Sequence, residues 1–405
     1  MGSKHSTPVV TGLSALPRGV WALGLVSLCM DMSSELIHSL LPVFLVGVLG
    51  ASKTLVGLIE GIAEAMALIV KIFSGAASDY LGRRKALTLL GYGMAAVTKP
   101  LFPLAGSVAT VFVARFIDRI GKGIRGAPRD ALIADLTPAN LRGASFGLRQ
   151  SLDTVGAVAG PILAIIAMGQ LDDDIRAVFW IAVIPAILSV IILVSFVQEP
   201  ERPVTADPAP PLRAADVKTL GRAYWLVVAT GAVLTLARFS EAFLVLRASE
   251  AGLADAYVPF VLVVMSVAYA ASAYPAGAWS DRAGRKIVLV AGIGLLVVAD
   301  VILALAPDIW LVMAGTLLWG LHMGLTQGLL AAMIADTVPR RLRGTAFGVF
   351  NLFSGIMMLA ASVLAGMLWD RFGVTSTFVA GAIFSAMSLI GIVCFARPRT
   401  ATPSR

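Results

Sequence analysis

The chain is built from long apolar stretches that alternate with short polar breaks. A helix that crosses the hydrocarbon core of a membrane needs about 20 apolar residues, and the stretches reach that length in regular succession. The pattern therefore predicts an all-α integral membrane protein with twelve spanning helices, whose ends are accurate to a few residues. The predicted spans are 20–49, 54–78, 86–106, 108–136, 143–169, 175–197, 222–249, 255–279, 287–306, 309–337, 344–369 and 374–396.

The break between the sixth and seventh predicted spans is longer and more polar than the others. It reads QEPERPVTADPAPPLRAADVKTL (198–220) and is rich in proline and charged residues, a composition typical of a surface linker. We therefore expect two six-helix bundles, at 1–197 and 221–405, joined by this linker.

Two segments of the first half return in the second half. GAASDYLGRR (75–84) returns as GAWSDRAGRK (277–286). ALIADLTPANLRGASFG (131–147) returns as AMIADTVPRRLRGTAFG (332–348), with 10 of 17 positions identical. Because both repeats fall at equivalent breaks, they indicate a duplicated six-helix unit. Parallel repeats of this kind build one large class of secondary transporters.

Composition supports a membrane protein and argues against several other classes. The chain is 58% hydrophobic and 14% charged, with a mean hydropathy of +0.88, whereas soluble domains are about half apolar and a quarter charged. The net charge of +8 does not point to nucleic acid, because the basic residues form short clusters between apolar stretches. The two cysteines, Cys29 and Cys394, lie in apolar runs and predict buried thiols rather than a disulfide framework.

The positions of lysine and arginine predict the orientation. Outside the spans, most of them lie in the two tails, the linker and the even-numbered loops, whereas the opposite loops hold only Lys53, Arg176 and Arg371. The positive-inside rule then places both termini and the linker in the cytoplasm. The polar N-terminal segment lacks a signal-peptide layout, so the first span is expected to be retained in the cell (inner) membrane.

The loop after the second predicted span carries the motif that identifies a resemblance. It has a glycine, an acid four residues later, and then Gly-Arg-Arg, and the second half repeats this layout. The chain thus resembles the major facilitator superfamily over almost its whole length. The resemblance implies twelve helices in two bundles, transport by alternating access, and a first helix that lines a central cavity.

Two weaker motif matches indicate a branch of this family. RIGKGIRGA (119–127) is similar to the Arg-x-x-Gln-Gly-x-Gly-Ala-Ala motif of proton-coupled members, although Lys122 replaces the glutamine. GAVAGPILA (156–164) resembles the Gly-x-x-x-Gly-Pro-x-x-Gly-Gly motif of antiporters, without the last two glycines. These matches favour export by proton antiport over uptake.

The repeated loops predict gates at one membrane surface. Asp79 lies near the end of the second predicted span and Asp135 ends the fourth, and Arg83 and Arg142 are expected to pair with them. Ion pairs that form in only one conformation bias an alternating-access equilibrium; the simpler alternative is that these charges only set topology. The predicted gating residues are Gly75, Asp79, Gly82, Arg83, Asp135, Arg142, Gly277, Asp281, Arg285, Asp336 and Arg343.

The first predicted span contains three titratable residues, Asp31, Glu35 and His38. They fall within about 60° of one another on a helix, and such groups in a membrane span usually face a cavity. We predict Asp31 and Glu35 as the proton-coupling acids and His38 as a substrate contact or proton relay. A structural hydrogen-bond cluster is the alternative.

Other spans contain further candidate substrate-binding residues. Glu60 and Glu64 share one face of the second span, and Arg119 of the fourth is expected to face the acids. In the seventh span, Arg238 and Glu241 are either cavity residues or an internal ion pair. Arg149 and Asp153, which are four residues apart, are expected to satisfy each other or to join the site.

The predicted function is therefore secondary transport of a small solute by a monomer without a cofactor, with protons as the coupling ion. No nucleotide-binding loop or hydrolase motif is present, so neither ATP drive nor an enzyme is expected. A carrier of a divalent metal or metal chelate is the alternative, because Asp, Glu and His can bind transition metals. A non-transporting receptor of the same fold stays open. The acids favour a cationic or neutral solute, whereas Arg119, Lys122 and Arg238 leave an anion open.

Overall fold

The computed structural model describes residues 16–200, 214–339 and 342–395, and all regular secondary structure in these ranges is helical. The first half contains α1 (Arg18–Val43), its π-helical continuation η2 (Phe44–Val48), α2 (Lys53–Leu81), α3 (Arg84–Thr98), η3 (Lys99–Leu101), α4 (Val108–Leu136), η4 (Ala139–Leu141), α5 (Arg142–Gln170), α6 (Ile175–Ile181) and α7 (Val183–Phe196). The second half contains α8 (Ala214–Lys218), α9 (Arg222–Ala237), α10 (Ala242–Glu250), η5 (Asp255–Tyr257), α11 (Phe260–Ala283), α12 (Arg285–Leu305), α13 (Ile309–Thr337), α14 (Arg343–Phe372) and α15 (Val374–Phe395).

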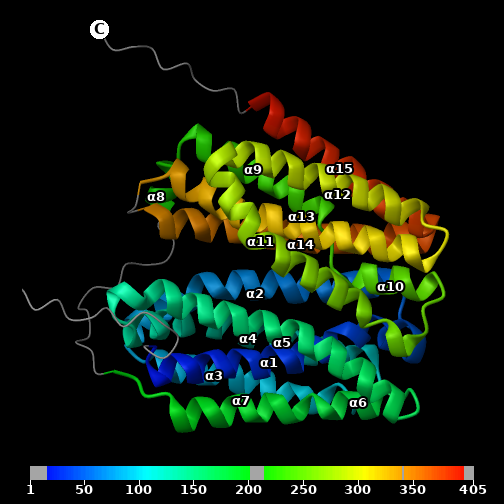
Figure 1. Ribbon diagram of the computed structural model, residues 1–405, viewed down its shortest axis with the longest axis horizontal. Coiled ribbons are helices and arrows are strands. Elements are labelled where there is room, and N and C mark those ends of the chain that lie inside the picture. Colours follow the sequence, from blue (N-terminus) through cyan, green and yellow to red (C-terminus); the bar gives the residue numbers. More distant parts are fainter. Residues whose placement is uncertain (1–15, 201–213, 340–341, 396–405) are drawn as a thin grey trace, which may run out of the picture.

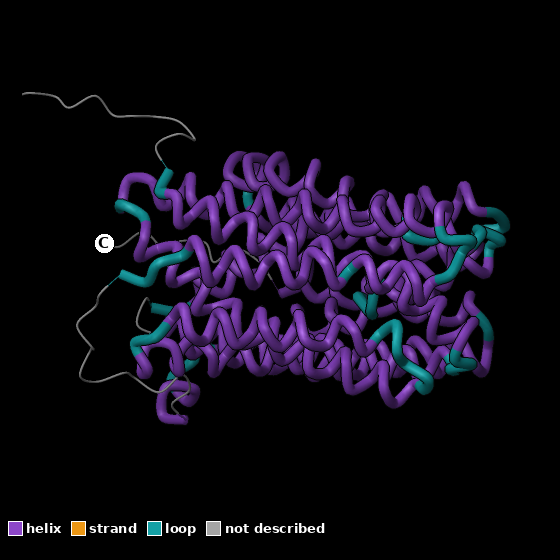
Figure 2. The backbone as a smooth tube through the Cα atoms, turned by 90° about the horizontal axis from the view of Figure 1, so that it is seen from below, coloured by secondary structure: helices purple, strands orange, loops and turns teal. Residues whose placement is uncertain are grey.

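The long helices of the two halves lie side by side along one axis (Figure 1). Helices α1 to α7 form one layer, and α9 with α11 to α15 form the other. A view turned by 90° shows the same alignment (Figure 2). We call the end at which α2 and α4 finish the motif end, because it carries the repeated loops around Gly82 and Gly284. It lies beside α8 in Figure 1, and the opposite end lies beside α6 and α10.

An apolar cluster joins the two halves at the opposite end. Its first-half members include Phe44 and Phe179, whose rings are 5.3 Å apart in a T-shaped arrangement. Its second-half members include Phe239, which lies 5.5 Å from Phe243 and 5.4 Å from the indole of Trp319. Aromatic rings bury large apolar areas and prefer such edge contacts, so this end of the interface is well packed.

Most predicted spans coincide with helices of the structure. Nine helices within the described ranges are long and apolar enough to cross a membrane, and they correspond to the first and to the fifth through twelfth predicted spans. The other three predicted spans form α2, α3 and α4. Helices α2 and α4 carry many charged residues and α3 has only 15 residues, so a membrane crossing by these three stays a prediction.

The seventh predicted span differs from the sequence-based expectation, because it is not one continuous helix. Helix α9 ends at Ala237 and α10 begins at Ala242. No proline or glycine lies at this break. Instead, tertiary contacts stabilise it: the backbone N–H of Ser240 donates to Ser362 Oγ on α14 at 3.2 Å. The predicted linker also contains the short helix α8, which the sequence did not indicate.

Candidate functional site

A cavity lies between the two halves, near the middle of the long helices. One part has a volume of about 300 Å³ and is lined by both halves, and the other part, of about 360 Å³, extends toward the motif end. Glu35, Glu64 and Lys122 line both parts, so we treat them as one central cavity. Its volume is in the range of small-molecule sites.

The central cavity is closed at the opposite end by contacts between α2 and α14. Asp370 of α14 accepts hydrogen bonds from the backbone N–H groups of Lys53 at 3.1 Å and of Thr54 at 2.8 Å. The Thr54 hydroxyl also donates to Asp370 at 2.6 Å. A carboxylate at a helix start satisfies free N–H groups and favours the helix dipole. Asp370 therefore caps α2 from the other half of the molecule.

One glycine allows these two helices to touch. A Cβ atom at Gly57 would lie only 2.0 Å from the carbonyl oxygen of Ser362 on α14. No other residue type fits at this contact without separating the helices. At the motif end, in contrast, the cavity residues Lys71 and Gln150 are exposed. The cavity is thus closed at one end and accessible at the other.

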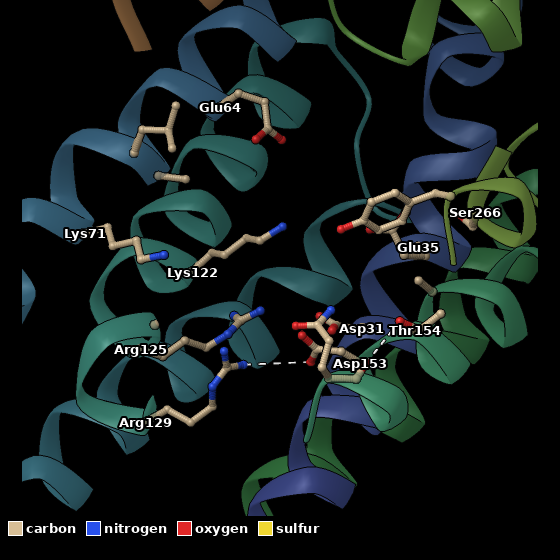
Figure 3. A pocket seen from close by; sticks show the side chains of 16 residues that line it. Asp31, Glu35, Glu64, Lys71, Lys122, Arg125, Arg129, Asp153, Thr154 and Ser266 are labelled. Carbon is tan, nitrogen blue, oxygen red and sulfur yellow. Dashed lines mark hydrogen bonds and ion pairs between the residues drawn. The ribbon is translucent and has the colours of Figure 1, made fainter. Parts of the chain in front are cut away.

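The three titratable residues predicted on the first span do lie on one helix and reach the cavity. Asp31 and Glu35 line the part near the motif end, and Glu35 and His38 line the middle part. Figure 3 shows Asp31 of α1 beside Asp153 of α5. His38 Nδ1 lies 3.3 Å from Glu35 Oε2, so these two side chains are hydrogen-bonded within α1.

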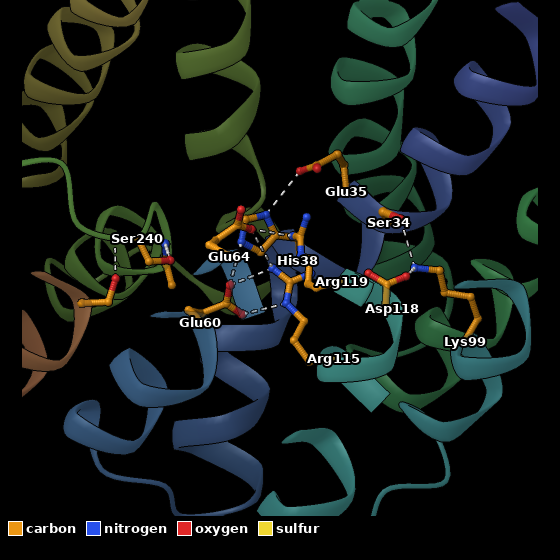
Figure 4. A network of polar contacts seen from close by, with 12 residues as sticks. Ser34, Glu35, His38, Glu60, Glu64, Lys99, Arg115, Asp118, Arg119 and Ser240 are labelled. Atoms are coloured by element: carbon orange, nitrogen blue, oxygen red, sulfur yellow. Dashed lines mark hydrogen bonds and ion pairs between the residues drawn. The ribbon is translucent and has the colours of Figure 1, made fainter. Parts of the chain in front are cut away.

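A continuous polar network joins α1, α2 and α4 (Figure 4). It starts at Glu35 and His38, and His38 Nε2 lies 3.6 Å from Glu60 Oε2. Glu60 is fully buried and accepts two bonds from Arg115, at 3.1 and 2.7 Å. Glu64 lies 3.1 Å from Arg119, which extends the network into the cavity. Of the two predicted glutamates, Glu64 lines the cavity and Glu60 lies behind it.

A second buried ion pair lies behind the same wall. Lys99 Nζ is 3.0 Å from Asp118 Oδ1 and donates to Ser34 Oγ at 3.0 Å. Both charged side chains are at most 3% exposed. The pair fixes the start of η3 against α1 and α4, and the sequence analysis did not identify it.

A third group of charges connects α4 to α5 at the motif end. Arg149 lies 3.1 Å from Asp153, which is the i to i+4 pair expected from the sequence. Arg129 approaches Asp130 at 3.1 Å and Asp153 at 3.9 Å. Arg149 also lies 3.8 Å from Asp130. Two arginines and two aspartates thus balance one another beside the cavity.

The charged residues missed on α4 follow a pattern that the sequence does contain. Arg115, Asp118, Arg119, Lys122 and Arg125 recur every three or four residues, which places them on one side of a helix. Arg115, Asp118, Arg119 and Arg125 are each at most 4% exposed. Only Arg119 was predicted as a binding residue, because the motif comparison drew attention to it.

The second half contributes the break in the seventh span to the cavity. Arg238, Glu241 and the intervening residues line its middle part. Within the described part of the chain, neither side chain has an ion-pair partner within 4.0 Å, so the internal Arg238–Glu241 pair does not form. Unwound backbone that lines a cavity is a feature of transporter binding sites.

At the motif end, one of the two ion pairs uses the residue next to the predicted one. Arg84, rather than Arg83, pairs with Asp135, and Arg285 pairs with Asp336 as expected. Arg84 and Arg285 are each the first residue of a helix, after connections of two residues (Gly82, Arg83) and one residue (Gly284). Each pair joins neighbouring helices of one half.

The other predicted gating residues surround these pairs or lie outside the description. Arg83, Arg142, Asp281 and Arg343 are exposed and have no ion-pair partner among the described side chains. Gly82, with φ of 60°, ends α2 in the left-handed region. The Asp79 side chain lies outside the described residues. Gly75 and Gly277 lie within α2 and α11.

Comparisons with known proteins agree with this architecture. The family model for the Major Facilitator Superfamily matches residues 23–248 and 226–405. An uncharacterized MFS-type transporter of Methanocaldococcus jannaschii is 33% identical over 384 residues, covering 92% of this chain and 94% of that protein. The inner membrane transport protein YajR of Escherichia coli is 26% identical over 387 residues, covering 92% and 82%.

Two further similarities are more limited. The multidrug resistance protein MdtL of Escherichia coli is 31% identical over 160 residues, only 39% of this chain and 40% of that protein. The crystal structure of the nucleoside transporter NupG has a TM-score of 0.77 at 13% identity and covers 93% of this chain and 98% of its own, so it supports the fold alone. By its helices, repeats and relatives, this chain belongs to the major facilitator superfamily and is a multi-pass inner membrane transporter, not an enzyme.

Proposed function

We propose that this secondary transporter moves a small solute in exchange for protons. The observation that carries the proposal is the pair Asp31 and Glu35, two ionisable groups on α1 that line a cavity accessible from one end only. Charged groups in a membrane interior are costly and mark ion or substrate pathways. If the two ends of the cavity open in turn, both solute and protons are carried across the membrane.

Asp31 is the first candidate for proton binding. It lies beside Asp153 in Figure 3, and two adjacent carboxyl groups can share a proton. Asp153 Oδ1 has no hydrogen-bond partner although it is buried. Glu35 is the second candidate, and its contacts with His38 and through it with Glu60 offer a relay along the network.

For the direction of transport, the proposal draws on the sequence rather than on the cavity. The positive-inside rule assigns the motif end, and with it the open end of the cavity, to the cytoplasm. The similarity of 156–164 to the antiporter motif supports exchange, so export driven by entering protons is the form of the proposal that we carry forward.

A metal or metal-chelate carrier is not favoured. In the described ranges, no three His, Cys, Asp or Glu side chains are grouped so that they could hold a metal ion. The acids nearest His38 face guanidinium groups instead: Glu60 pairs with Arg115 and Glu64 with Arg119. A divalent cation would have to displace these arginines.

The test measures proton movement in proteoliposomes that contain the pH-sensitive dye pyranine. Organic cations, neutral compounds and organic anions are added outside one at a time. Exchange predicts that a transported compound raises the internal pH, because protons leave as it enters. Asp31→Asn or Glu35→Gln should abolish this signal while the compound still shifts the protein's melting temperature. Asp172→Asn, in the loop between α5 and α6, is the matched control.

Two results would overturn the proposal. The first is that no compound that binds the protein moves protons in either direction. The second is that Asp31→Asn and Glu35→Gln both keep the full pH response, in which case neither acid is the proton site. A fall in internal pH would replace exchange with cotransport.

A further inference from the structure

The central cavity holds more basic groups than its acids engage. Two of its arginines have carboxylate partners: Arg119 contacts Glu64 at 3.1 Å, and Arg129 contacts Asp130 at 3.1 Å. The remaining lysine and arginine residues that line it are Lys71, Lys122, Arg125 and Arg238. Within the described part of the chain, none of these four side chains makes an ion pair or a hydrogen bond.

Arg125 shows most clearly that a partner is missing. Its side chain is only 4% exposed, and its Nη1 is buried without a hydrogen-bond partner. The guanidinium stacks on the ring of Tyr92, with 4.6 Å between Cζ and the ring centroid. Stacking holds the group in place but leaves its N–H donors free. A buried charge without a counter-ion is expensive, and an arginine fork fits a carboxylate or a phosphate.

Three of these cations share one wall of the cavity. Figure 3 shows Lys71 from α2 and Lys122 and Arg125 from α4 pointing into the same space. Asp31 and Asp153 lie across that space, and among the described side chains neither forms an ion pair within 4.0 Å with any of the three. The space between the walls is part of the 360 Å³ volume. It is large enough for a small solute between the cations and the carboxyl pair.

Four of the five acids that line the cavity are engaged or offset, and the fifth, Asp31, lies beside Asp153 rather than in an ion pair. Glu64 and Asp153 contact arginines, and Glu35 contacts His38. Glu241 lacks an ion-pair partner, but Arg238 lies in the same non-helical segment and offsets its charge. The excess charge of the cavity wall is therefore positive, on α2 and α4.

We propose that the central cavity binds a small organic anion, with its carboxylate or phosphate group held by Lys71, Lys122 and Arg125. The ring of Tyr269 from α11 lines the same space, and Trp319 and Met323 line the middle part. These side chains would contact an apolar or aromatic body of the solute. An anion there would connect the two halves, since its charge meets the first half and its body meets the second.

An anionic solute also bears on the direction of coupling. A bound anion and an ionised Asp31 or Asp153 repel each other across the cavity, so the anion binds best when the carboxyl pair holds a proton. Solute and proton would then bind together at this pair, so the exchange proposed above would use Glu35, the second candidate, as its proton site. Exchange of an anion for protons would require a proton site other than this pair.

The inference rests on the proposed function only in taking the central cavity as the transport site, and its test measures ligand binding. The purified full chain is titrated with four probes that share a ring: benzoate, phenyl phosphate, benzyl alcohol and benzylamine. Benzoate or phenyl phosphate should raise the melting temperature, and the comparison of the two tells carboxylate from phosphate. The neutral and cationic probes should have no effect at the same concentration.

Variants assign the binding to the named wall. Lys122→Gln and Arg125→Met should each weaken binding of the anionic probe at least about tenfold, equivalent to about 1.4 kcal/mol. Arg125→Met should not lower the melting temperature without ligand, because it removes an unpaired buried charge. Arg222→Gln, an exposed arginine at the start of α9, is the control and should bind as the wild type does.

Three results would overturn the inference: stabilisation by benzylamine instead of the anions, no stabilisation by either anion, or unchanged anion binding in both variants. Failure here is separate from failure of the proposed function. A protein that moves protons with a cationic compound keeps the transport proposal and loses the anion site. A protein that binds anions without moving protons keeps the anion site and loses the transport proposal.

Discussion

Arg115 and Glu60 form a two-point ion pair in the interior of the first half. Nε of Arg115 lies 3.1 Å from Oε1 of Glu60, and Nη2 lies 2.7 Å from Oε2. Both residues are at most 2% exposed. The pair joins α2 to α4 directly behind the cavity wall, so it holds Glu64 and Arg119 in place one helical turn further along.

Glu60→Gln should therefore reduce stability more than Glu64→Gln does. Removing one partner of a buried pair leaves the other charge uncompensated, at a cost of about 3–5 kcal/mol. The Glu64 side chain is 31% exposed, so water can replace part of its interaction and the cost is smaller. The measurement is the melting temperature of each purified variant. A wild-type melting temperature combined with lost solute binding would instead make Glu60 a substrate ligand.

The two ion pairs at the motif end should differ in strength. Arg84 and Asp135 are 15% and 8% exposed, whereas Arg285 and Asp336 are 39% and 61% exposed. Exposed pairs contribute about 0–1 kcal/mol and are screened by salt. Asp135→Asn should thus lower the melting temperature more than Asp336→Asn, at both low and high salt. Equal losses would show that burial does not control these pairs.

Asp281 tests the gate hypothesis separately, since it is exposed and unpaired in this conformation. A gating acid would find its partner only in the other conformation. Asp281→Asn should then change the free energy of unfolding by no more than about 0.5 kcal/mol, as surface changes do, and slow transport. Asp308→Asn, at the exposed start of α13, serves as control, because an asparagine can also accept the capping hydrogen bond from the Leu311 N–H. Wild-type transport by Asp281→Asn would leave only the topological role of this charge.

Gly57→Ala should open the interface at the opposite end. Its Cβ would meet the Ser362 carbonyl oxygen at 2.0 Å, so α2 and α14 must separate and the closed arrangement becomes less populated. A cysteine introduced at Thr54 should react faster with a membrane-impermeant maleimide in this background. Gly93→Ala adds a Cβ with nothing within 4 Å and should leave the rate unchanged. An unchanged rate in Gly57→Ala would mean that the closed arrangement tolerates the methyl group.

Separate expression of residues 1–207 and 208–405 tests the expected division into two bundles. Each bundle has its own short-range helix packing, such as α3 on α4 and α12 on α13, and the break falls in the polar linker. The two pieces should co-purify from membranes when expressed together. Insertion of both pieces without co-purification would argue against two self-contained bundles.

The sequence predicted the helices better than it predicted the site, for a physical reason. In lipid, each span must satisfy its backbone hydrogen bonds internally, so an apolar stretch of sufficient length is enough to predict a helix. The pairing of charges depends on which helices are neighbours. Lys99 and Asp118, for example, belong to different helical segments, and no spacing rule relates them.

Some of the missed features were partly visible. The three- to four-residue spacing of charges on α4 indicated one polar face, although not which charges it would meet. The shift from Arg83 to Arg84 could not be read from the repeat, because it depends on the helix α3 starting one residue later than α12 does. The break at 238–241 had no sequence signal at all, since the Ser362 hydroxyl oxygen that accepts the stabilising hydrogen bond from the Ser240 N–H belongs to a helix far along the chain.

That break divides the seventh span into pieces with different neighbours. Helix α9 packs on α13, α14 and α15, whereas α10 packs on α1 and α2 as well as on α11 and α13. A continuous helix would transmit every tilt of α9 to the opposite end. With the helix interrupted, we expect α9 to tilt without moving α10. Arg247 of α10 donates to the carbonyl oxygens of Leu303 and Ala306, so α10 is fixed to the end of α12 as well as to the first half. A hinge at 238–241 would therefore let the cavity change shape around its solute without first breaking the contacts at the opposite end.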